Sequence, residues 1–171
     1  IRTEELMSKG YLAKLNAKIL LLKHDERVFD SYQEEIDYLI KHEQRNNFIK
    51  NLSIDLKGNT LVLFSRVEDH GKVLFELINK NIGEDRKVFF IHGGVDVEDR
   101  ELARSIIENE KNSIIVASYG TFSTGINIKN LHNVIFASPS KSRIRNLQSI
   151  GRVLRKGNNK FSATLYDIAD D

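Results

Sequence analysis

The hydrophobic residues of this chain fall into short apolar runs separated by stretches of helical spacing. The runs are rich in β-branched and aromatic residues and have the length of buried strands. From residue 60 onward they predict strands at Thr60–Ser65, Lys87–Ile91, Ser113–Ala117, Asn133–Ala137 and Phe161–Tyr166.

Between these strands, apolar residues recur every three or four positions, as on the buried face of a helix. The first such series is Val73, Leu74, Leu77 and Ile78. The helices predicted in this way are Glu68–Asn79, Asp96–Asn109 and Ser142–Arg155.

Strands that alternate with helices predict an α/β fold, in which a mostly parallel sheet carries helices on both faces. Ligands of such sheets bind at the carboxyl ends of the strands. The loops expected at that edge are Arg66–Asp69, His92–Val95, Ser118–Ile126 and Ser138–Lys141.

The first 56 residues have a more helical pattern than the rest of the chain. Thr3–Lys9 predicts a short helix that ends at Gly10, and Leu15–Leu22 predicts a strand. Tyr32–Leu56 predicts one long, charged helical region, whose simplest role is to pack on the sheet.

The composition is that of a globular protein, since 40% of the 171 residues are hydrophobic and 29% are charged. This length fits one domain with a sizeable core. No apolar run approaches the roughly 20 residues of a membrane span, so we expect no membrane partner. The chain has no cysteine, which excludes disulfides and thiolate metal sites and fits a reducing compartment such as the cytoplasm.

The charges are distributed unevenly along the chain, although the net charge is only +2. Residues 111–166 contain nine Lys and Arg and no acidic residue, whereas residues 1–110 contain 17 Lys and Arg against 21 Asp and Glu. A basic half beside an acidic half favours a phosphate-bearing partner, either a nucleotide or a nucleic acid.

The run QSIGRVLR near the C-terminus places two guanidinium groups and an amide on one side of the predicted helix. Gln148, Arg152 and Arg155 fall within about 60° of one another at helical spacing. Arginine forks of this kind suit a polyphosphate, and arginines supplied to a transferring phosphate from a second body are arginine fingers. A solvated basic helix face is the alternative interpretation.

The chain lacks the sequence elements that hold a triphosphate by themselves. No G-x-x-x-x-G-K-[ST] phosphate loop is present, because Gly71 and Lys72 are followed by Val73, and G-x-G-x-x-G is also absent. Leu20–Glu26 resembles a Walker B strand end, but Lys23 and His24 interrupt it, which favours an ordinary polar strand end.

Two of the expected loops have the composition of a phosphate site. Ser118–Asn127 combines hydroxyls and glycines after a strand, and Ile91–Gly94 ends in paired glycines that let a backbone approach closely. A polar turn in the first loop and a tight turn in the second are the alternatives.

Taken in order, these segments resemble the second RecA-like motor domain of superfamily 2 helicases over residues 58–168. The likeness is to a phage recombination and repair DNA helicase within that superfamily, and Thr3–Ala13 resembles the bridge between its two motor domains. The resemblance implies a bridge at residues 1–14 and a motor domain at residues 15–171. The matching segments are Leu61–Arg66 (motif IV), Ile91–Gly94 with Arg100 (motif IVa), Ser118–Asn127 (motif V) and Gln148–Arg155 (motif VI).

The resemblance implies roles toward ATP, with Mg²⁺, bound mainly on a first motor domain that this chain lacks. Arg155 corresponds to the arginine finger on the γ-phosphate, and Arg152 to a second phosphate contact. Gln148 would position the γ-phosphate or the attacking water. Gly125 and Asn127 match positions that line the nucleotide.

The resemblance also implies contacts with the backbone of DNA, which we expect as a branched structure or a junction of single and double strands. Either Ser118 or Tyr119 would take the phosphate-contacting position of motif V. The residues that match positions near the nucleic acid are Ser65, Arg66, His92, Gly93, Ser118 and Thr121.

The expected function is therefore half of an ATP-dependent DNA helicase that is inactive without its N-terminal RecA-like partner domain. Three alternatives share these residues. They are a duplex translocase that does not separate strands, a non-enzymatic nucleic-acid-binding α/β domain, and an RNA helicase.

Overall fold

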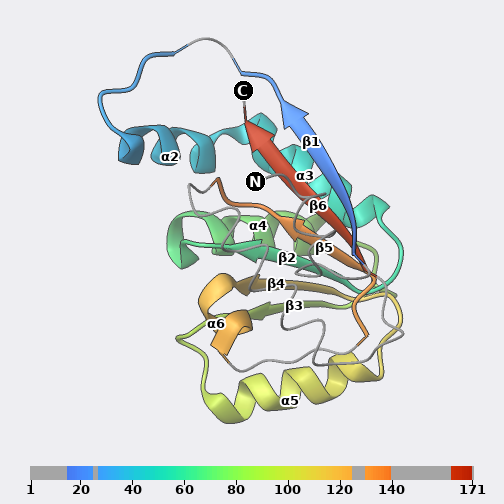
Figure 1. Ribbon diagram of the computed structural model, residues 1–171. Coiled ribbons are helices and arrows are strands. Elements are labelled where there is room, and N and C mark those ends of the chain that lie inside the picture. Colours follow the sequence, from blue (N-terminus) through green and yellow to red (C-terminus); the bar gives the residue numbers. More distant parts are fainter. Residues whose placement is uncertain (1–14, 25–26, 125–129, 140–162, 171) are drawn as a thin grey trace.

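The computed structural model describes residues 15–24, 27–124, 130–139 and 163–170, which are coloured in Figure 1. These residues form one six-stranded sheet in the order β1-β6-β5-β2-β4-β3. All five pairings between neighbouring strands are parallel. The strands are β1 (Leu15–Leu22), β2 (Thr60–Phe64), β3 (Val88–Ile91), β4 (Ile114–Ser118), β5 (Asn133–Phe136) and β6 (Ala163–Asp170).

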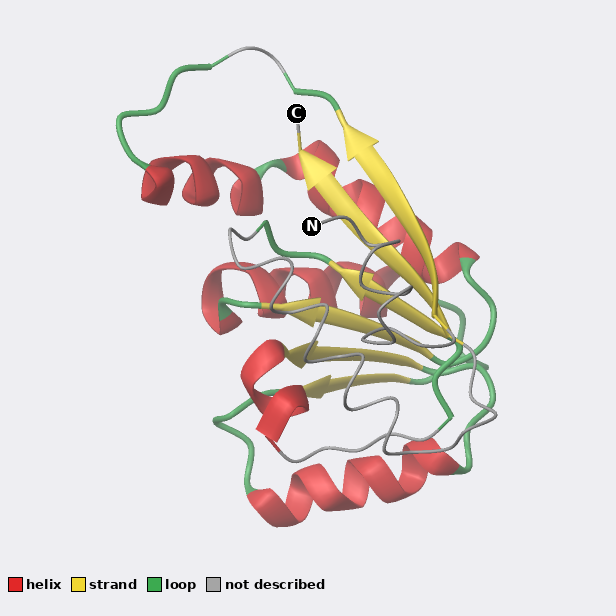
Figure 2. Ribbon diagram, in the orientation of Figure 1, coloured by secondary structure: helices red, strands yellow, loops and turns green. Residues whose placement is uncertain are grey.

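Helices cover both faces of the sheet, as Figures 1 and 2 show. Helices α3 and α4 lie over one face, and α5 lies over the other. The predicted α/β architecture is therefore confirmed. The helices are α2 (Tyr32–Lys41), α3 (Glu43–Asp55), the π-helical turn η1 (Val67–Gly71), α4 (Lys72–Asn81), α5 (Val97–Glu108) and α6 (Tyr119–Thr124).

The central strands are buried on both sides, and alternate residues serve the two faces. In β2, Leu61 and Leu63 pack on the side of α5, whereas Val62 and Phe64 pack on the side of α3 and α4. All four side chains are fully buried. Strands covered on both faces read as continuous apolar runs, which is why the sequence pattern identified them.

The last strand differs from its prediction because it continues to Asp170 rather than ending at Tyr166. The expected end rested on the charged residues that follow Tyr166. In the structure β1 pairs with β6 along its whole length, from Leu15 with Ala163 to Leu22 with Asp170. The carboxylate of Asp170 pairs there with the guanidinium of Arg45 and is hydrogen-bonded to His24, so the charge does not end the strand.

The helical region predicted at Tyr32–Leu56 is confirmed, but it is divided at His42 into α2 and α3. The break is capped from both sides by that one residue. The backbone N–H of His42 donates to the carbonyl of Leu39 at 3.3 Å, and its Nδ1 accepts from the backbone N–H of Arg45 at 3.3 Å. A histidine that caps two helices at once leaves no periodicity signal.

The helix predicted from Glu68 begins instead with the π-helical turn η1. The backbone N–H of Gly71 donates to the carbonyl of Arg66 at 2.8 Å, a bond that spans five residues. This wider turn leaves His70 fully buried. The predicted helices Thr3–Lys9 and Ser142–Arg155 and the bridge at residues 1–14 lie outside the described residues.

None of the helices described by the structure is long and apolar enough to cross a membrane.

Gly71→Ala should destabilise the fold by about 1–3 kcal/mol, because the added methyl would overlap the ring of Phe64 in the core. Gly71 has helical dihedral angles, so propensity alone would favour alanine. The free energy of unfolding can be measured with urea. Gly120→Ala, where the methyl meets nothing within 4 Å, is the control that should lose no stability. Equal stability of the two variants would contradict the close packing of Gly71.

Candidate functional site

The described residues predicted to contact nucleic acid gather at one edge of the sheet. Ser65, His92 and Ser118 lie at the carboxyl ends of β2, β3 and β4. These strands are neighbours in the order β2-β4-β3, and their register pairs Phe64 with Ser118 and Ile91 with Ala117. The three loops therefore leave the sheet at the same level, where parallel sheets place their ligands.

The loop after β2 is held by side chains from other elements. The backbone N–H of Ser65 donates to Oγ of Ser138 at 2.9 Å, which ties the end of β2 to the segment after β5. Arg66 donates from Nη1 to Oδ1 of Asp37 on α2. Of the two side chains, Arg66 is 30% exposed and Asp37 is 45% exposed. The guanidinium of Arg66 is thus accessible at this edge, and it is paired with the carboxylate of Asp37.

The loop after β3 presents backbone rather than side chain. The ring of His92 packs 4.9 Å from that of Phe90, and its Nδ1 accepts from the backbone N–H of Gly94 at 3.0 Å. Gly93 is exposed, and a Cβ placed there would meet nothing within 4 Å. The peptide at Gly93 is therefore open to a close approach from outside.

The hydroxyls after β4 are turned toward each other. Oγ of Ser118 donates to Oγ1 of Thr121 at 2.7 Å and accepts from the backbone N–H of Thr121 at 3.3 Å. Both residues are buried, at 9% and 4% exposure. In this arrangement they fix the start of α6, and their contact with nucleic acid stays a prediction.

Tyr119 packs its ring against Phe136, with the ring centroids 5.5 Å apart. Burial raises the pKa of its phenol well above the ordinary value. Of the two residues considered for the phosphate-contacting position of motif V, Tyr119 is therefore the one used in packing. The predicted nucleotide residues lie outside the described residues; they are Gln148, Arg152, Arg155, Gly125 and Asn127.

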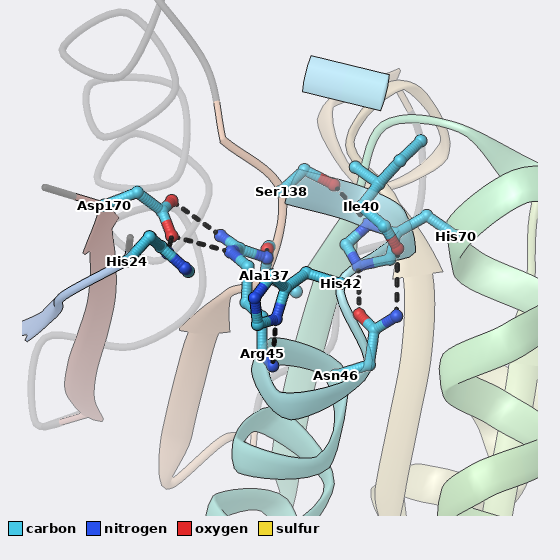
Figure 3. A network of polar contacts seen from close by, with 9 residues as sticks. All are labelled: His24, Ile40, His42, Arg45, Asn46, His70, Ala137, Ser138 and Asp170. Carbon is cyan, nitrogen blue, oxygen red and sulfur yellow. Dashed lines mark hydrogen bonds and ion pairs between the residues drawn. The ribbon is translucent and has the colours of Figure 1, made fainter. Parts of the chain in front are cut away.

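A buried ion pair that no sequence pattern indicated lies at the same edge (Figure 3). Arg45 of α3 donates from Nε and Nη2 to the two carboxylate oxygens of Asp170, at 2.9 and 3.1 Å. Its Nη1 donates to the carbonyl of Ala137 at 2.5 Å. The side chain of Arg45 has no exposed surface, and His24 donates from Nε2 to Asp170 at 2.8 Å. The pair thus joins α3 to the ends of β1, β5 and β6.

His70 connects this cluster to the loop after β2. Nδ2 of Asn46 donates to the carbonyl of Ile40 at 2.9 Å, so its Oδ1 faces His70 and must accept from Nε2, 3.1 Å away. The other ring nitrogen, Nδ1, lies 3.0 Å from Oγ of Ser138. A neutral ring satisfies both contacts when Nε2 carries the proton and the Ser138 hydroxyl donates to Nδ1.

The environment of His70 favours that neutral ring. Burial and, to a smaller extent, the charges of Arg45 and Arg66 together lower the pKa of His70 from 6.5 to about 3, against the opposing effect of Asp170. The sequence could not point to this network, because Arg45 and Asp170 are 125 positions apart. No local spacing links two residues so distant in the chain.

The structure describes no group of three or more His, Asp or Glu residues that could hold a metal ion. Arg45 and Asp170 are occupied by each other, and His70 by Asn46 and Ser138. The buried polar residues of this edge are therefore suited to holding loops in place, whereas Ser65, Arg66 and Gly93 reach its surface.

Parallel strands in this order are those of the RecA-like fold found in the C-terminal domains of helicases. The chain belongs to the family of the helicase conserved C-terminal domain, whose model matches residues 43–157. The resemblance to superfamily 2 helicases is thereby confirmed.

The phage relative behind that resemblance is UvsW, and two comparisons confirm the likeness. The ATP-dependent DNA helicase UvsW of Enterobacteria phage T4 is 42% identical, over 99% of this chain and 35% of UvsW. The crystal structure of T4 UvsW has a TM-score of 0.80 and 41% identity, over 92% of this chain and 33% of that one. The chain thus spans about a third of the length of this relative.

Two more distant relatives are associated with RNA, one by its name and the other by the molecule bound in its structure. A putative ATP-dependent RNA helicase, L396 of Acanthamoeba polyphaga mimivirus, is 32% identical over 74% of this chain and 23% of its own length. Domain 2 of the DEAD-box helicase Mss116p, solved with an RNA duplex, has a TM-score of 0.56 at 14% identity, over 92% of this chain and 55% of its own. At that identity the likeness shows a shared fold alone.

The stability of the wild type should fall as the pH is lowered from 6.5 toward 3, by up to about 1.4 kcal/mol per pH unit from His70 alone. The folded-state pKa of His70 is depressed, so the unfolded chain binds a proton that the folded chain excludes. His70→Gln removes this titration and keeps a donor toward Asn46.

Urea unfolding at about pH 7.5 and about pH 5 measures the effect. The wild type should lose more stability than His70→Gln between the two conditions, since all other titrating groups are shared. Parallel losses in the two proteins would mean that the folded chain holds His70 charged.

Proposed function

We propose that this chain is the second motor domain of an ATP-dependent DNA helicase or branched-DNA remodelling motor related to UvsW. The observation that carries the proposal is the gathering of Ser65–Arg66, His92–Gly93 and Ser118–Thr121 at the carboxyl ends of three adjacent strands. The sequence predicts these residues from three separate motifs, and the fold brings the three motifs to one edge of the sheet. The relative that supports DNA as the substrate is described as a DNA helicase and matches nearly the whole chain.

The proposed grip on nucleic acid is a grip on its backbone. Gly93 leaves its peptide open, and Arg66 supplies an accessible guanidinium. Neither reads a base edge, so the contact is independent of sequence and weakens as salt rises. Such a contact suits a motor that must hold any sequence and then release it.

ATP, with Mg²⁺, would bind mainly to a first RecA-like domain. Two features support this division: the sequence lacks a phosphate loop, and the described residues offer no metal cluster. When bound there, the nucleotide supplies the phosphoryl transfer that drives the motor. Residues of this chain would complete that site, with Arg155 and Arg152 as donors to the developing charge and Gln148 orienting the γ-phosphate or the attacking water.

Closure of the cleft between the two domains would complete the phosphoryl-transfer site, and opening would separate it again. The nucleic-acid edge and motif VI belong to one domain, so each closure would also move Arg66 and Gly93 along the strand. This coupling is how a RecA-like pair converts hydrolysis into movement, and it predicts that this chain alone hydrolyses no ATP.

Arg155→Ala in the full-length protein should lower the turnover of DNA-stimulated ATP hydrolysis about a thousandfold or more, because an arginine finger acts on the transition state. DNA binding and the circular dichroism spectrum should be unchanged. Lys111→Ala removes one exposed positive charge from the same basic stretch and is the matched control. Near wild-type turnover of Arg155→Ala would reduce motif VI to a basic face and favour a binding module.

Gly93→Ala should weaken binding to a labelled oligodeoxythymidylate about fivefold, because the methyl keeps a phosphate from the open peptide. Stability should stay within about 0.5 kcal/mol of the wild type, since the methyl meets no other atom. Fluorescence anisotropy and urea unfolding measure the two effects.

Gly83→Ala is the control for this experiment. Gly83 precedes β3, at the opposite edge of the sheet, and a Cβ there would meet only the flexible side chain of Asp85. It should leave binding unchanged. If Gly93→Ala also binds as well as the wild type, the backbone at Gly93 is not part of the interface.

A further inference from the structure

The guanidinium of Arg66 is paired with a carboxylate from a distant part of the chain. Its Nη1 donates to Oδ1 of Asp37, which lies 29 positions earlier on α2. Both side chains are partly exposed, at 30% and 45%. The pair therefore lies on the surface of the proposed nucleic-acid edge, outside the buried network of Arg45 and His70.

The helix that carries Asp37 is fixed at both ends. Oγ of Ser31 accepts from the backbone N–H of Glu34 at 3.2 Å and caps the start of α2. Near its end, Leu39 and Ile40 are buried, and the carbonyl of Ile40 accepts from Nδ2 of Asn46. Asp37 is thus presented to the edge by a rigid element.

The backbone of Arg66 is fixed as well. The preceding N–H, that of Ser65, donates to Ser138, and the carbonyl of Arg66 accepts from the N–H of Gly71 at 2.8 Å. With both backbones held in this way, the guanidinium of Arg66 and the carboxylate of Asp37 lie within reach of each other. The ion pair thus joins two side chains that stand on fixed elements of the fold.

Among Arg45, His70 and Arg66, the described groups whose charges act on one another at this edge, Arg66 is the cation that a phosphate could use. Arg45 is buried and its charge is matched by Asp170. His70 is neutral between Asn46 and Ser138. A carboxylate and a phosphodiester are the same kind of partner for a guanidinium, since both are anions that accept its N–H groups.

We infer that Asp37 occupies the place of a backbone phosphate on Arg66 and competes with nucleic acid for it, which makes Asp37 an affinity-limiting residue of the interface. This inference rests on the proposed function. A phosphate can bind the guanidinium only if it displaces Asp37 or shares the guanidinium with it. The affinity for nucleic acid is therefore lower than an unpaired Arg66 would give. Removing the carboxylate must therefore tighten binding, whereas a residue that merely orients Arg66 would weaken binding when removed.

The test is the affinity of the full-length protein for a labelled oligodeoxythymidylate, measured by fluorescence anisotropy over a series of salt concentrations. Asp37→Asn should tighten binding about fivefold at low salt, the scale of one exposed ion pair. The plot of log affinity against log salt should steepen by up to about 0.7, one further phosphate contact on a single strand. Asp37→Ser gives the same comparison if Asp37→Asn does not fold.

Two controls separate competition at Arg66 from a general change of charge. Glu35→Gln removes one exposed negative charge from the same helix and should change the affinity less than twofold. In an Arg66→Ala background, Asp37→Asn should have no effect, because the contested group is gone. Unchanged or weaker binding by Asp37→Asn overturns the inference, and so does a tightening that persists without Arg66 or equals that of Glu35→Gln.

The outcomes also separate this inference from the proposed function. If the wild type binds the oligonucleotide and Arg66→Ala binds it less well, the proposed interface stands whatever Asp37 does. If the wild type binds no nucleic acid, the proposed function fails and the inference fails with it.

Discussion

Arg45 is a charged side chain with no exposed surface, and the edge of the sheet is arranged around it. An unpaired guanidinium in the interior costs several kcal/mol, so its N–H groups must find partners. Asp170 provides both carboxylate oxygens and Ala137 provides a carbonyl. Because Ala137 directly follows β5 and Asp170 is the last residue of β6, one buried charge ties α3 to the ends of both strands.

The buried cluster around Arg45 also holds the loops of the proposed nucleic-acid edge in position. Asn46 follows Arg45 on α3 and holds His70, which shares Ser138 with the backbone of Ser65. Apolar packing against two faces explains why the sheet is stable, but it is not directional and does not decide where each loop leaves its strand. Hydrogen bonds and ion pairs are directional and set where each loop leaves its strand, and they leave Arg66 at the surface. In the interface that we propose, the guanidinium of Arg66 can pair with either Asp37 or a phosphate.

The sequence predicted what depends on local pattern. Leu61–Phe64 and Ile114–Ala117 are apolar on both faces, so their strands and the doubly covered sheet followed from composition and spacing. The helicase-like motifs indicated that the candidate site lies at the carboxyl ends of these strands. The π-helical turn before Lys72, the break at His42 and the extension to Asp170 could not be predicted, because each depends on partners brought together by the fold. Asp37 was hidden for the same reason, since nothing in an acidic helix shows that one of its carboxylates meets an arginine 29 positions away.

If this chain grips nucleic acid for a motor powered by ATP on another domain, as we propose, nucleic acid should stimulate ATP hydrolysis. The most direct measurement is the rate of ATP hydrolysis by the full-length wild-type protein as single-stranded and branched DNA are added. We expect the rate to rise to saturation with DNA and to lose this stimulation as salt is raised. A rate that is indifferent to DNA at low salt, in a protein that is folded and binds ATP, would contradict it.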